Sequence, residues 1–215
     1  PKCKNLQYKE SNIKVIVGDV NAESTKNEVN RFDKFDLIVD DGSHNSDDII
    51  KTFCNYFNHL KDGGLFIIED LHCSYWREHK GGLFYPISSI NFFKKLVDII
   101  NYEHWGIDKK KEWLLRGFTS NYKIDIASLA FDQIHSIEFF NSLCFIKKKP
   151  YQYNKLGKRV VVGGEAITEP ERKKLNDLDA ISLDQSPNPW SNNNLLPEEE
   201  LVLYKQKLEK IEKKN

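Results

Sequence analysis

Three short apolar runs in the first third of the sequence each lead into a carboxylate, and this repeated pattern constrains the fold more than any other feature. The runs cover residues 13–17, 35–39 and 65–68, and the acids that follow are Asp19, Asp40, Asp41, Glu69 and Asp70. Short apolar runs that alternate with amphipathic stretches predict parallel strands connected by helices. Residues just beyond the carboxyl ends of such strands converge on one crevice. The pattern therefore predicts an α/β fold with acidic side chains at one edge of its sheet.

Apolar residues at helical spacing predict the elements that connect these strands. Residues 47–60 form one amphipathic segment, which Gly63 and Gly64 follow, and residues 88–102 form a second. Further short strands are predicted at residues 127–131, 134–140 and 143–146, the last two joined as an antiparallel hairpin at Asn141 and Ser142. We expect a Rossmann-like, mostly parallel sheet with helices on both faces and an antiparallel C-terminal hairpin, contained within residues 1–150.

The composition changes after residue 150. Glycine, proline and asparagine interrupt residues 151–196, which predicts an irregular arm with one short helix near residues 169–178. Residues 197–215 begin acidic and end basic, as suits the helix dipole, and predict an amphipathic terminal helix. Its apolar stripe, at heptad spacing, consists of Leu201, Tyr204, Leu208 and Ile211. An isolated helix of this length is marginal in water, so the stripe should dock on its own domain or on another subunit. We favour another subunit, and thus a homo-oligomer.

Charge and cysteine content exclude several classes of protein. The sequence has 32 basic and 32 acidic residues, so it lacks the basic excess that draws proteins to nucleic acid or to anionic membranes. No run approaches the roughly 20 apolar residues of a membrane-spanning helix. The four cysteines are far apart, which argues against a disulfide framework and against a zinc ribbon. We expect a cytoplasmic protein with no nucleic-acid partner and no membrane span.

The converging carboxylates need a counter-charge, because like charges repel and each pays a desolvation cost. Oxygen-rich ligation favours a hard divalent cation such as Mg²⁺ or Mn²⁺ over zinc. A single aspartate after a strand often only caps the next helix. Two acidic pairs, each trailed by a histidine (His44 or His72), favour a metal site over that simpler explanation. His72 is either a hydrogen-bonding neighbour of the site or a packed side chain, and we assign no role to His135.

The segments DDGSH at residues 40–44 and EDLHCSYW at residues 69–76 resemble those of class I S-adenosylmethionine-dependent methyltransferases. The best resemblance is to the metal-dependent sugar O-methyltransferases of the mycinamicin and macrocin type, over roughly residues 12–149. It implies that Asp41, Glu69 and Asp70 bind Mg²⁺ or Mn²⁺ and that His44 is the catalytic base. On the cofactor side it implies a binding role for four residues, of which the first three would lie near the adenine of S-adenosylmethionine: Gly18, Asp19, Val20 and Asp40.

One part of that class has no counterpart in the sequence. The glycine-rich loop after the first strand, and the acid after the second strand that holds the cofactor ribose, are not found, and we expect residues 1–150 to be a partial domain that starts beyond them. The function implied is metal-assisted O-methyl transfer from S-adenosylmethionine to a hydroxyl of a sugar or glycan. The main alternative is a non-catalytic methyltransferase-like module in a glycan or natural-product assembly protein. A metal-dependent hydrolase or oxygenase is less favoured, because such an oxygenase uses two histidines and one carboxylate.

Overall fold

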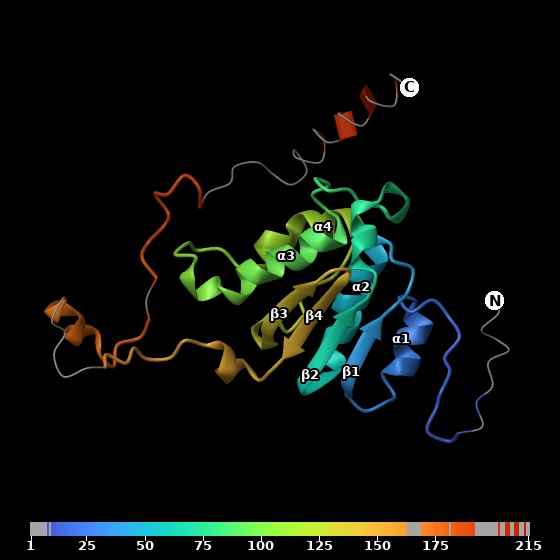
Figure 1. Cartoon of the computed structure of the whole chain (residues 1–215), viewed down its shortest axis with the longest axis horizontal. Helices are drawn as coiled ribbons and strands as arrows, with labels where there is room; N and C mark the ends of the chain where they lie inside the picture. The colour runs from blue at the N-terminus through green and yellow to red at the C-terminus, as the bar shows by residue number, and fades with distance from the viewer. Residues whose placement is uncertain are drawn as a thin grey trace.

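The computed structural model describes residues 8, 10–162, 169–180 and 182–191, together with 202, 205–206, 209–210 and 213. A four-stranded mixed sheet with the strand order β1-β2-β4-β3 forms its centre (Figure 1). The strands are β1 (Phe35–Asp40), β2 (Leu60–Ile68), β3 (Ile134–Phe140) and β4 (Leu143–Lys148). β1 and β2 are parallel, and β4 runs antiparallel to both β2 and β3. The α/β class and the C-terminal hairpin expected from the sequence are confirmed, but the sheet is mixed and not mostly parallel, because two of its three strand pairs are antiparallel.

Helices connect and flank these strands. The α-helices of the described residues are α1 (Glu23–Val29), α2 (Ser46–Tyr56), α3 (Ser89–Ile100) and α4 (Arg116–Tyr122). The short 3-10 helices are η2 (Phe57–His59), η3 (Leu71–Tyr75), η4 (Arg77–His79), η5 (Tyr102–His104), η6 (Lys111–Leu115), η7 (Phe131–Gln133), η8 (Tyr151–Asn154) and η9 (Pro170–Leu175). The strand expected at residues 127–131 is wrong. The Ala127 N–H bonds to the Asp125 side chain and Leu129 N–H to the Ile126 carbonyl, so local turns take up this backbone.

An aromatic cluster forms the centre of the core. The ring of Phe53, on α2, lies 5.3 Å from that of Phe66 on β2 and 5.5 Å from that of Phe93 on α3, and both contacts are edge-on. All three side chains are fully buried. Such pairs add stabilisation beyond the burial of apolar area. The cluster fixes α2 and α3 beside each other against one face of the sheet.

The opposite face of the sheet is largely open, which differs from the expected cover on both faces. Leu37, Val39 and Phe140 are 52%, 45% and 54% exposed there. The order β1-β2-β4-β3 moves across the sheet in one direction without returning past β1. Right-handed crossovers that advance in one direction place their helices on the same face. α2 and α3 therefore share a face, and among the described residues the other face has no matching layer.

The first predicted strand is also absent from the sheet. Residues 13–17 have no regular secondary structure, and Ile13, Val15 and Val17 are each partly exposed to solvent. A β-branched run becomes a strand only when a neighbouring strand accepts its backbone hydrogen bonds. β1 pairs with β2 on one side, and none of the described residues forms a ladder on its other side. The predicted strand at residues 13–17 is therefore wrong, because an apolar pattern does not show whether a neighbouring strand is present.

The C-terminal segments were predicted as an irregular arm and a terminal helix. Within residues 151–191 the structure has η8, η9 and a single antiparallel bridge between Lys158 and Asp179. The helix expected near residues 169–178 is present as η9. The stripe residues of the predicted terminal helix at 197–215 lie outside the described residues, so that helix and the domain boundaries stay predictions. In the described part of the chain, no helix is long and apolar enough to cross a membrane.

Candidate metal and acid–base site

The two acidic pairs lie side by side at the carboxyl ends of β1 and β2. Asp40 is in register with Ile68, and the Glu69 N–H donates a 2.9 Å hydrogen bond to the Asp40 carbonyl. This extends the parallel ladder by one step beyond β2. Asp41 and Asp70 then leave the sheet at the same edge, as the sequence predicted.

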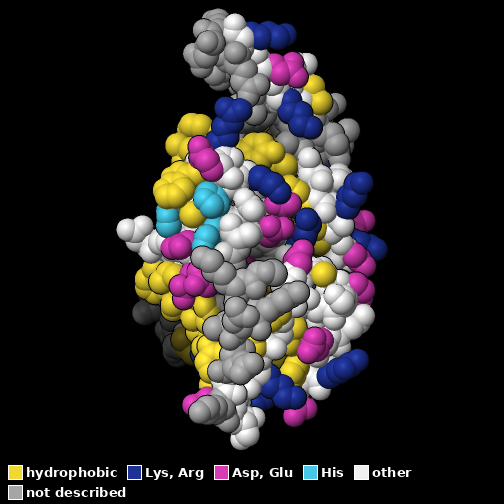
Figure 2. All heavy atoms as spheres, turned by 90° about the vertical axis from the view of Figure 1, so that its right-hand side faces the viewer, with side chains coloured by type: hydrophobic (Ala, Val, Ile, Leu, Met, Phe, Trp, Pro, Cys, Tyr) yellow, Lys and Arg dark blue, Asp and Glu magenta, His cyan; other side chains and the backbone are white. Residues whose placement is uncertain are grey.

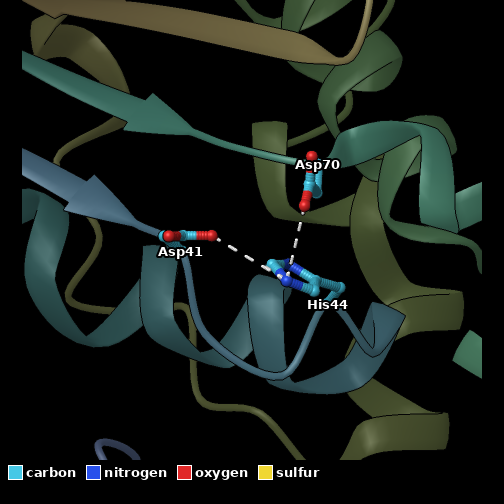
Figure 3. A group of neighbouring side chains, drawn as sticks. All are labelled: Asp41, His44 and Asp70. Atoms are coloured by element: carbon cyan, nitrogen blue, oxygen red, sulfur yellow. Dashed lines mark ion pairs between the residues drawn. The ribbon is translucent and has the colours of Figure 1, made fainter.

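Asp41, His44 and Asp70 form a compact group at this edge (Figure 3). The His44 Nε2 atom lies 3.8 Å from Asp41 Oδ1 and 3.7 Å from Asp70 Oδ2. His44 and Asp70 also adopt left-handed backbone conformations, with φ of 57° and 49°. Such conformations cost non-glycine residues on the order of 1 kcal/mol or more and concentrate at functional sites. The backbone therefore has an unfavourable conformation at two of the three residues.

The group has the donors that a hard divalent cation requires. One ligand atom from each residue lies within 4.8 Å of the others, and both carboxylates are about half exposed. Exposed carboxylate oxygens leave room for the water ligands that Mg²⁺ retains. Glu69 is not part of this group, although its backbone continues the β1–β2 ladder. Its predicted role as a third ligand remains a prediction.

Ser142, which sequence reasoning treated only as a turn residue, connects two side chains of the site. Its hydroxyl lies 2.6 Å from His72 Nδ1 and 3.4 Å from Asp70 Oδ1. Because Ile68 pairs with Cys144 in an antiparallel ladder, two more residues along each strand bring Asp70 opposite Ser142. The contact thus depends on the register of the β3–β4 turn against β2. His72 is accordingly a hydrogen-bonding neighbour of the site.

His79 is a second residue that the sequence did not single out. Its ring centroid lies 6.2 Å from that of His44 and 6.0 Å from that of Trp76, and its Nδ1 atom is buried without a hydrogen-bond partner. Figure 2 shows histidine side chains gathered beside acidic ones on this side of the molecule. The sequence pattern does not predict the position of His79, because that position depends on the path of η3 and η4.

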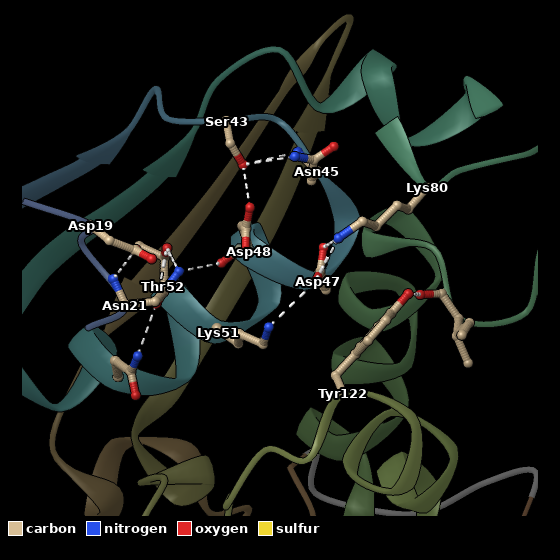
Figure 4. A network of polar contacts seen from close by, with 12 residues as sticks. Asp19, Asn21, Ser43, Asn45, Asp47, Asp48, Lys51, Thr52, Lys80 and Tyr122 are labelled. Carbon is tan, nitrogen blue, oxygen red and sulfur yellow. Dashed lines mark hydrogen bonds and ion pairs between the residues drawn. The ribbon is translucent and has the colours of Figure 1, made fainter. Parts of the chain in front are cut away.

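An ion pair anchors the loop that carries His79 to α2. Lys80 Nζ lies 2.8 Å from Asp47 Oδ1, and Lys51 Nζ lies 3.3 Å from Asp47 Oδ2 (Figure 4). Burial alone would raise the pKa of Asp47, but the hydrogen bonds and charges of Lys80 and Lys51 outweigh it and hold that pKa below its usual range. The carboxylate therefore stays ionised and the loop stays attached.

Asp40, expected on the cofactor side, is a buried carboxyl at the end of β1. It is 8% exposed, and its Oδ2 atom has no hydrogen-bond partner. Burial raises the pKa of Asp40 to about 6. Its contact with the cofactor remains a prediction.

Gly18, Asp19 and Val20 form a turn that packs against α2. Asp19 Oδ1 accepts the Asn21 N–H at 2.8 Å, and the Tyr56 hydroxyl donates to the Val20 carbonyl at 2.6 Å. The backbone carbonyl of Asp48 accepts a hydrogen bond from the side-chain amide of Asn21, and the Asp48 carboxylate accepts one from the hydroxyl of Ser43 (Figure 4). Asp48 of α2 thus connects the turn at residues 18–20 with the loop that carries His44.

Sequence comparison finds relatives of one kind. No protein-family model matches the chain. It is 35% identical over 99 residues to demethylmacrocin O-methyltransferase of Streptomyces fradiae, covering 44% of this chain and 25% of that protein. It is 34% identical over 107 residues to mycinamicin VI 2''-O-methyltransferase of Micromonospora griseorubida, covering 47% and 27%. The chain thus spans about a quarter of the length of the curated relatives it matches.

Solved structures with the same fold carry related names. The MycE methyltransferase of the mycinamycin biosynthetic pathway, in complex with Mg, SAH and mycinamycin VI, superposes with a TM-score of 0.53 at 23% identity, over 74% of this chain and 37% of that one. A crystal form with Mg and SAH gives a TM-score of 0.52 at 24% identity, over 65% and 34%. The described residues therefore have the fold of part of a methyltransferase, as the resemblance in residues 40–44 and 69–76 implied.

Proposed function

We propose that this chain takes part in metal-assisted O-methyl transfer from S-adenosylmethionine to a hydroxyl of a sugar or glycan. The observation that carries the proposal is the group of Asp41, His44 and Asp70 at the carboxyl ends of two parallel strands. Its support is the set of relatives, all named as O-methyltransferases, three of them for rhamnosyl or olivosyl compounds. The acceptor is a small molecule or glycan, and the cation is Mg²⁺ or Mn²⁺.

The residues of the group have separable tasks. Asp41 and Asp70 would hold a divalent cation, which would lower the pKa of a hydroxyl beside it. His44 Nε2 would accept the hydroxyl proton as the oxygen attacks the methyl carbon of S-adenosylmethionine and the carbon–sulfur bond breaks, with S-adenosylhomocysteine as the leaving group. The two carboxylates, both within 4 Å of Nε2, stabilise the imidazolium that forms. The Ser142 hydroxyl, itself hydrogen-bonded to His72, would hold Asp70 in place by donating to its carboxylate.

Several further assignments belong to the same proposal. Glu69 would complete the ligand set, and Gly18, Asp19, Val20 and Asp40 would face the cofactor. We also propose a cytoplasmic location and a homo-oligomer formed through residues 197–215. The free thiols of Cys54, Cys73 and Cys144 support a reducing compartment.

The test is direct binding followed by turnover. Titration of the chain with Mn²⁺, read by electron paramagnetic resonance, should give one site, and Asp41→Asn or Asp70→Asn should remove it. Glu69→Gln tests whether Glu69 is a ligand: Mn²⁺ binding should weaken in this variant if Glu69 belongs to the site and should not change if it does not. His44→Gln should leave Mn²⁺ bound but lower methyl transfer from labelled S-adenosylmethionine to glycosylated acceptors by roughly 10²-fold.

Each outcome has a meaning. If His44→Gln also abolishes Mn²⁺ binding, His44 is a metal ligand and not the base. If S-adenosylhomocysteine and Mn²⁺ both bind but no acceptor is methylated, the non-catalytic alternative is favoured. Methyl transfer that survives exhaustive chelation would contradict the metal's role.

A further inference from the structure

A cavity of about 590 Å³ lies apart from the carboxylate–histidine group, on the side of α3 that faces η6 and α4. None of its lining residues belongs to the group of Asp41, His44 and Asp70. One wall is a face of α3, where Asn91, Lys94, Lys95 and Asp98 succeed one another over about 10 Å of helix. Figure 1 shows α3 and α4 next to each other at this place. The cavity is therefore a groove along a helix, long enough for more than one small ring.

One end of the groove lies at the start of α3, which is hydrogen-bonded to the start of α2. Pro86 and Ile87 line it just before the start of α3. In the first turn of α3, the Ser89 N–H donates a 3.0 Å hydrogen bond to the hydroxyl of Ser46, which is the first residue of α2 and lies two residues after His44. A ligand that extends along α3 thus has one end near the loop that carries His44.

The charges of the groove are unbalanced. Lys94, Lys95 and Arg116 line it, against the single carboxylate of Asp98. None of these three cations forms an ion pair with the described residues. The Arg116 guanidinium stacks 4.1 Å from the centre of the Trp113 ring, and its Nη1 atom donates to the Trp113 carbonyl. These contacts fix its position without neutralising its charge. Electrostatic complementarity therefore favours an anionic ligand.

Indole rings supply the apolar surface of the groove. Trp105 and Trp190 line it together with Trp113. The Trp105 ring is fixed, because its Nε1–H donates to the Asp98 carbonyl at 2.9 Å. Trp190 is 93% exposed, which is costly for so large an apolar side chain unless a ligand or partner covers it. Flat rings with adjacent polar groups suit the C–H face of a sugar ring, whose hydroxyls then reach Asp98.

The segment that carries Trp190 is docked, so this wall is part of the fold. Gln185 N–H donates to the Gly106 carbonyl at 2.7 Å, and the Ser182 hydroxyl donates to the His104 carbonyl at 3.0 Å. Gly106 has φ of +62°, and a Cβ atom there would lie 2.1 Å from the Leu183 carbonyl oxygen. Only glycine allows the two backbones to approach this closely.

We propose that this groove binds a saccharide that carries a carboxylate or a phosphate, with sugar rings against Trp105 and Trp190 and the anionic group on Lys94, Lys95 and Arg116. The proposal rests on the proposed function for the sugar nature of the ring, and it narrows the acceptor class to anionic saccharides. The groove is then a binding subsite beside the methyl-transfer edge.

The test measures binding without methyl donor or metal, so that it does not depend on catalysis. Calorimetry on the whole chain compares a glucuronate-containing trisaccharide, a neutral trisaccharide of equal length, a hexose 1-phosphate and inorganic phosphate. We expect one or both anionic sugars to bind at least tenfold more tightly than the neutral trisaccharide and inorganic phosphate. Lys94→Gln with Lys95→Gln, and separately Trp190→Ala, should each weaken binding at least tenfold. These side chains are at least partly exposed, so the variants should fold, and Lys110→Gln on a neighbouring exposed position is the matched control.

The outcomes are distinct. A preference for the trisaccharide or for the hexose phosphate identifies the anion as a carboxylate or a phosphate. Equal affinity for the neutral trisaccharide, phosphate as tight as hexose phosphate, no effect of the lysine or tryptophan changes, or no binding at all would each overturn the proposal. Asp41→Asn should leave this binding unchanged. Absence of methyl transfer by the unaltered chain, with saccharide binding intact, would count against the proposed function alone.

Discussion

At the scale of single residues, Ser142 is the side chain through which the β3–β4 turn reaches Asp70. Ser142→Ala removes a hydroxyl that contacts both Asp70 and His72 while leaving the backbone of the turn unchanged. Substitution of a residue that orients a metal ligand typically weakens metal binding by about 10- to 100-fold. We expect Mn²⁺ to bind at least tenfold more weakly to this variant. Ser128→Ala, on an exposed turn, is the control, and equal Mn²⁺ affinities in the two variants would show that Ser142 has no such role.

His59 gives the stability of the chain a dependence on pH. Burial, and then the nearby charges of Lys148 and Lys34, hold the pKa of His59 below its usual value of about 6.5. The unfolded chain therefore binds a proton at a pH where the folded chain does not. The resulting stability is fully present above about pH 6.5 and is lost as the pH falls through the lowered pKa.

The variant His59→Gln should remove this loss. Thermal unfolding of the variant and the parent, followed by circular dichroism from pH 7.5 to 5, should show a smaller decline for the variant. The raised pKa of Asp40 acts in the opposite direction, because that carboxyl takes up a proton more readily in the folded state below about pH 6. Its effect is common to both proteins and cancels in the difference. Parallel declines would refute the role of His59.

At the scale of elements, Lys148 joins the end of β4 to the start of β2. Its side chain is 2% exposed, and Nζ donates to the Leu60 carbonyl at 2.8 Å and to the Asn58 carbonyl at 3.1 Å. Hydrogen bonds from a charged donor contribute about 1.5–3 kcal/mol each, and both carbonyls would lose their donor. Lys148→Ala should lower the free energy of unfolding by about 2–4 kcal/mol in urea titrations. Lys147→Ala, on the exposed face of the same strand, should change it by less than about 0.5 kcal/mol.

Several elements that the sequence predicted correctly have a structural neighbour that is close in the chain. β3 and β4 form one hairpin, and α2 begins and ends next to the strands it connects. Residues 13–17 and 127–131 have the same apolar periodicity but lack a strand partner among the described residues. Periodicity reports which side chains avoid water, and it carries no information on whether a backbone partner is present.

The site was predictable to the extent that it follows strand ends. Asp41 and Asp70 were found from their places after two parallel strands, and His44 from its place three residues after Asp41. Ser142 and His79 were not found. Ser142 requires the register of an antiparallel neighbour, and His79 requires the path of two 3-10 helices. Both are consequences of tertiary structure that no local spacing records.

At the scale of the whole molecule, the open face of the sheet should be detectable in solution. Leu37 and Val39 on β1 and Phe140 on β3 are large apolar side chains exposed on this face, and soluble monomers seldom leave large apolar surfaces uncovered. We expect the folded chain to enhance the fluorescence of an anilinonaphthalene sulfonate dye, and Leu37→Thr with Val39→Thr to reduce that signal at least twofold. Threonine retains the preference for a strand. Leu83→Thr with Phe84→Thr, in an exposed loop, is the control, and an equal reduction there would assign the dye to another surface.

The same open face has a consequence for the heat capacity of unfolding. The heat-capacity increase on unfolding comes chiefly from apolar surface that the folded state hides and the unfolded state hydrates, and it averages about 12–15 cal/mol/K per residue. Side chains such as Leu37 and Val39 are already half hydrated in the folded chain, so their exposure adds little. Calorimetry should therefore give a value below this average, and the free energy of unfolding should vary with temperature along a flatter curve than that of a sheet covered on both faces.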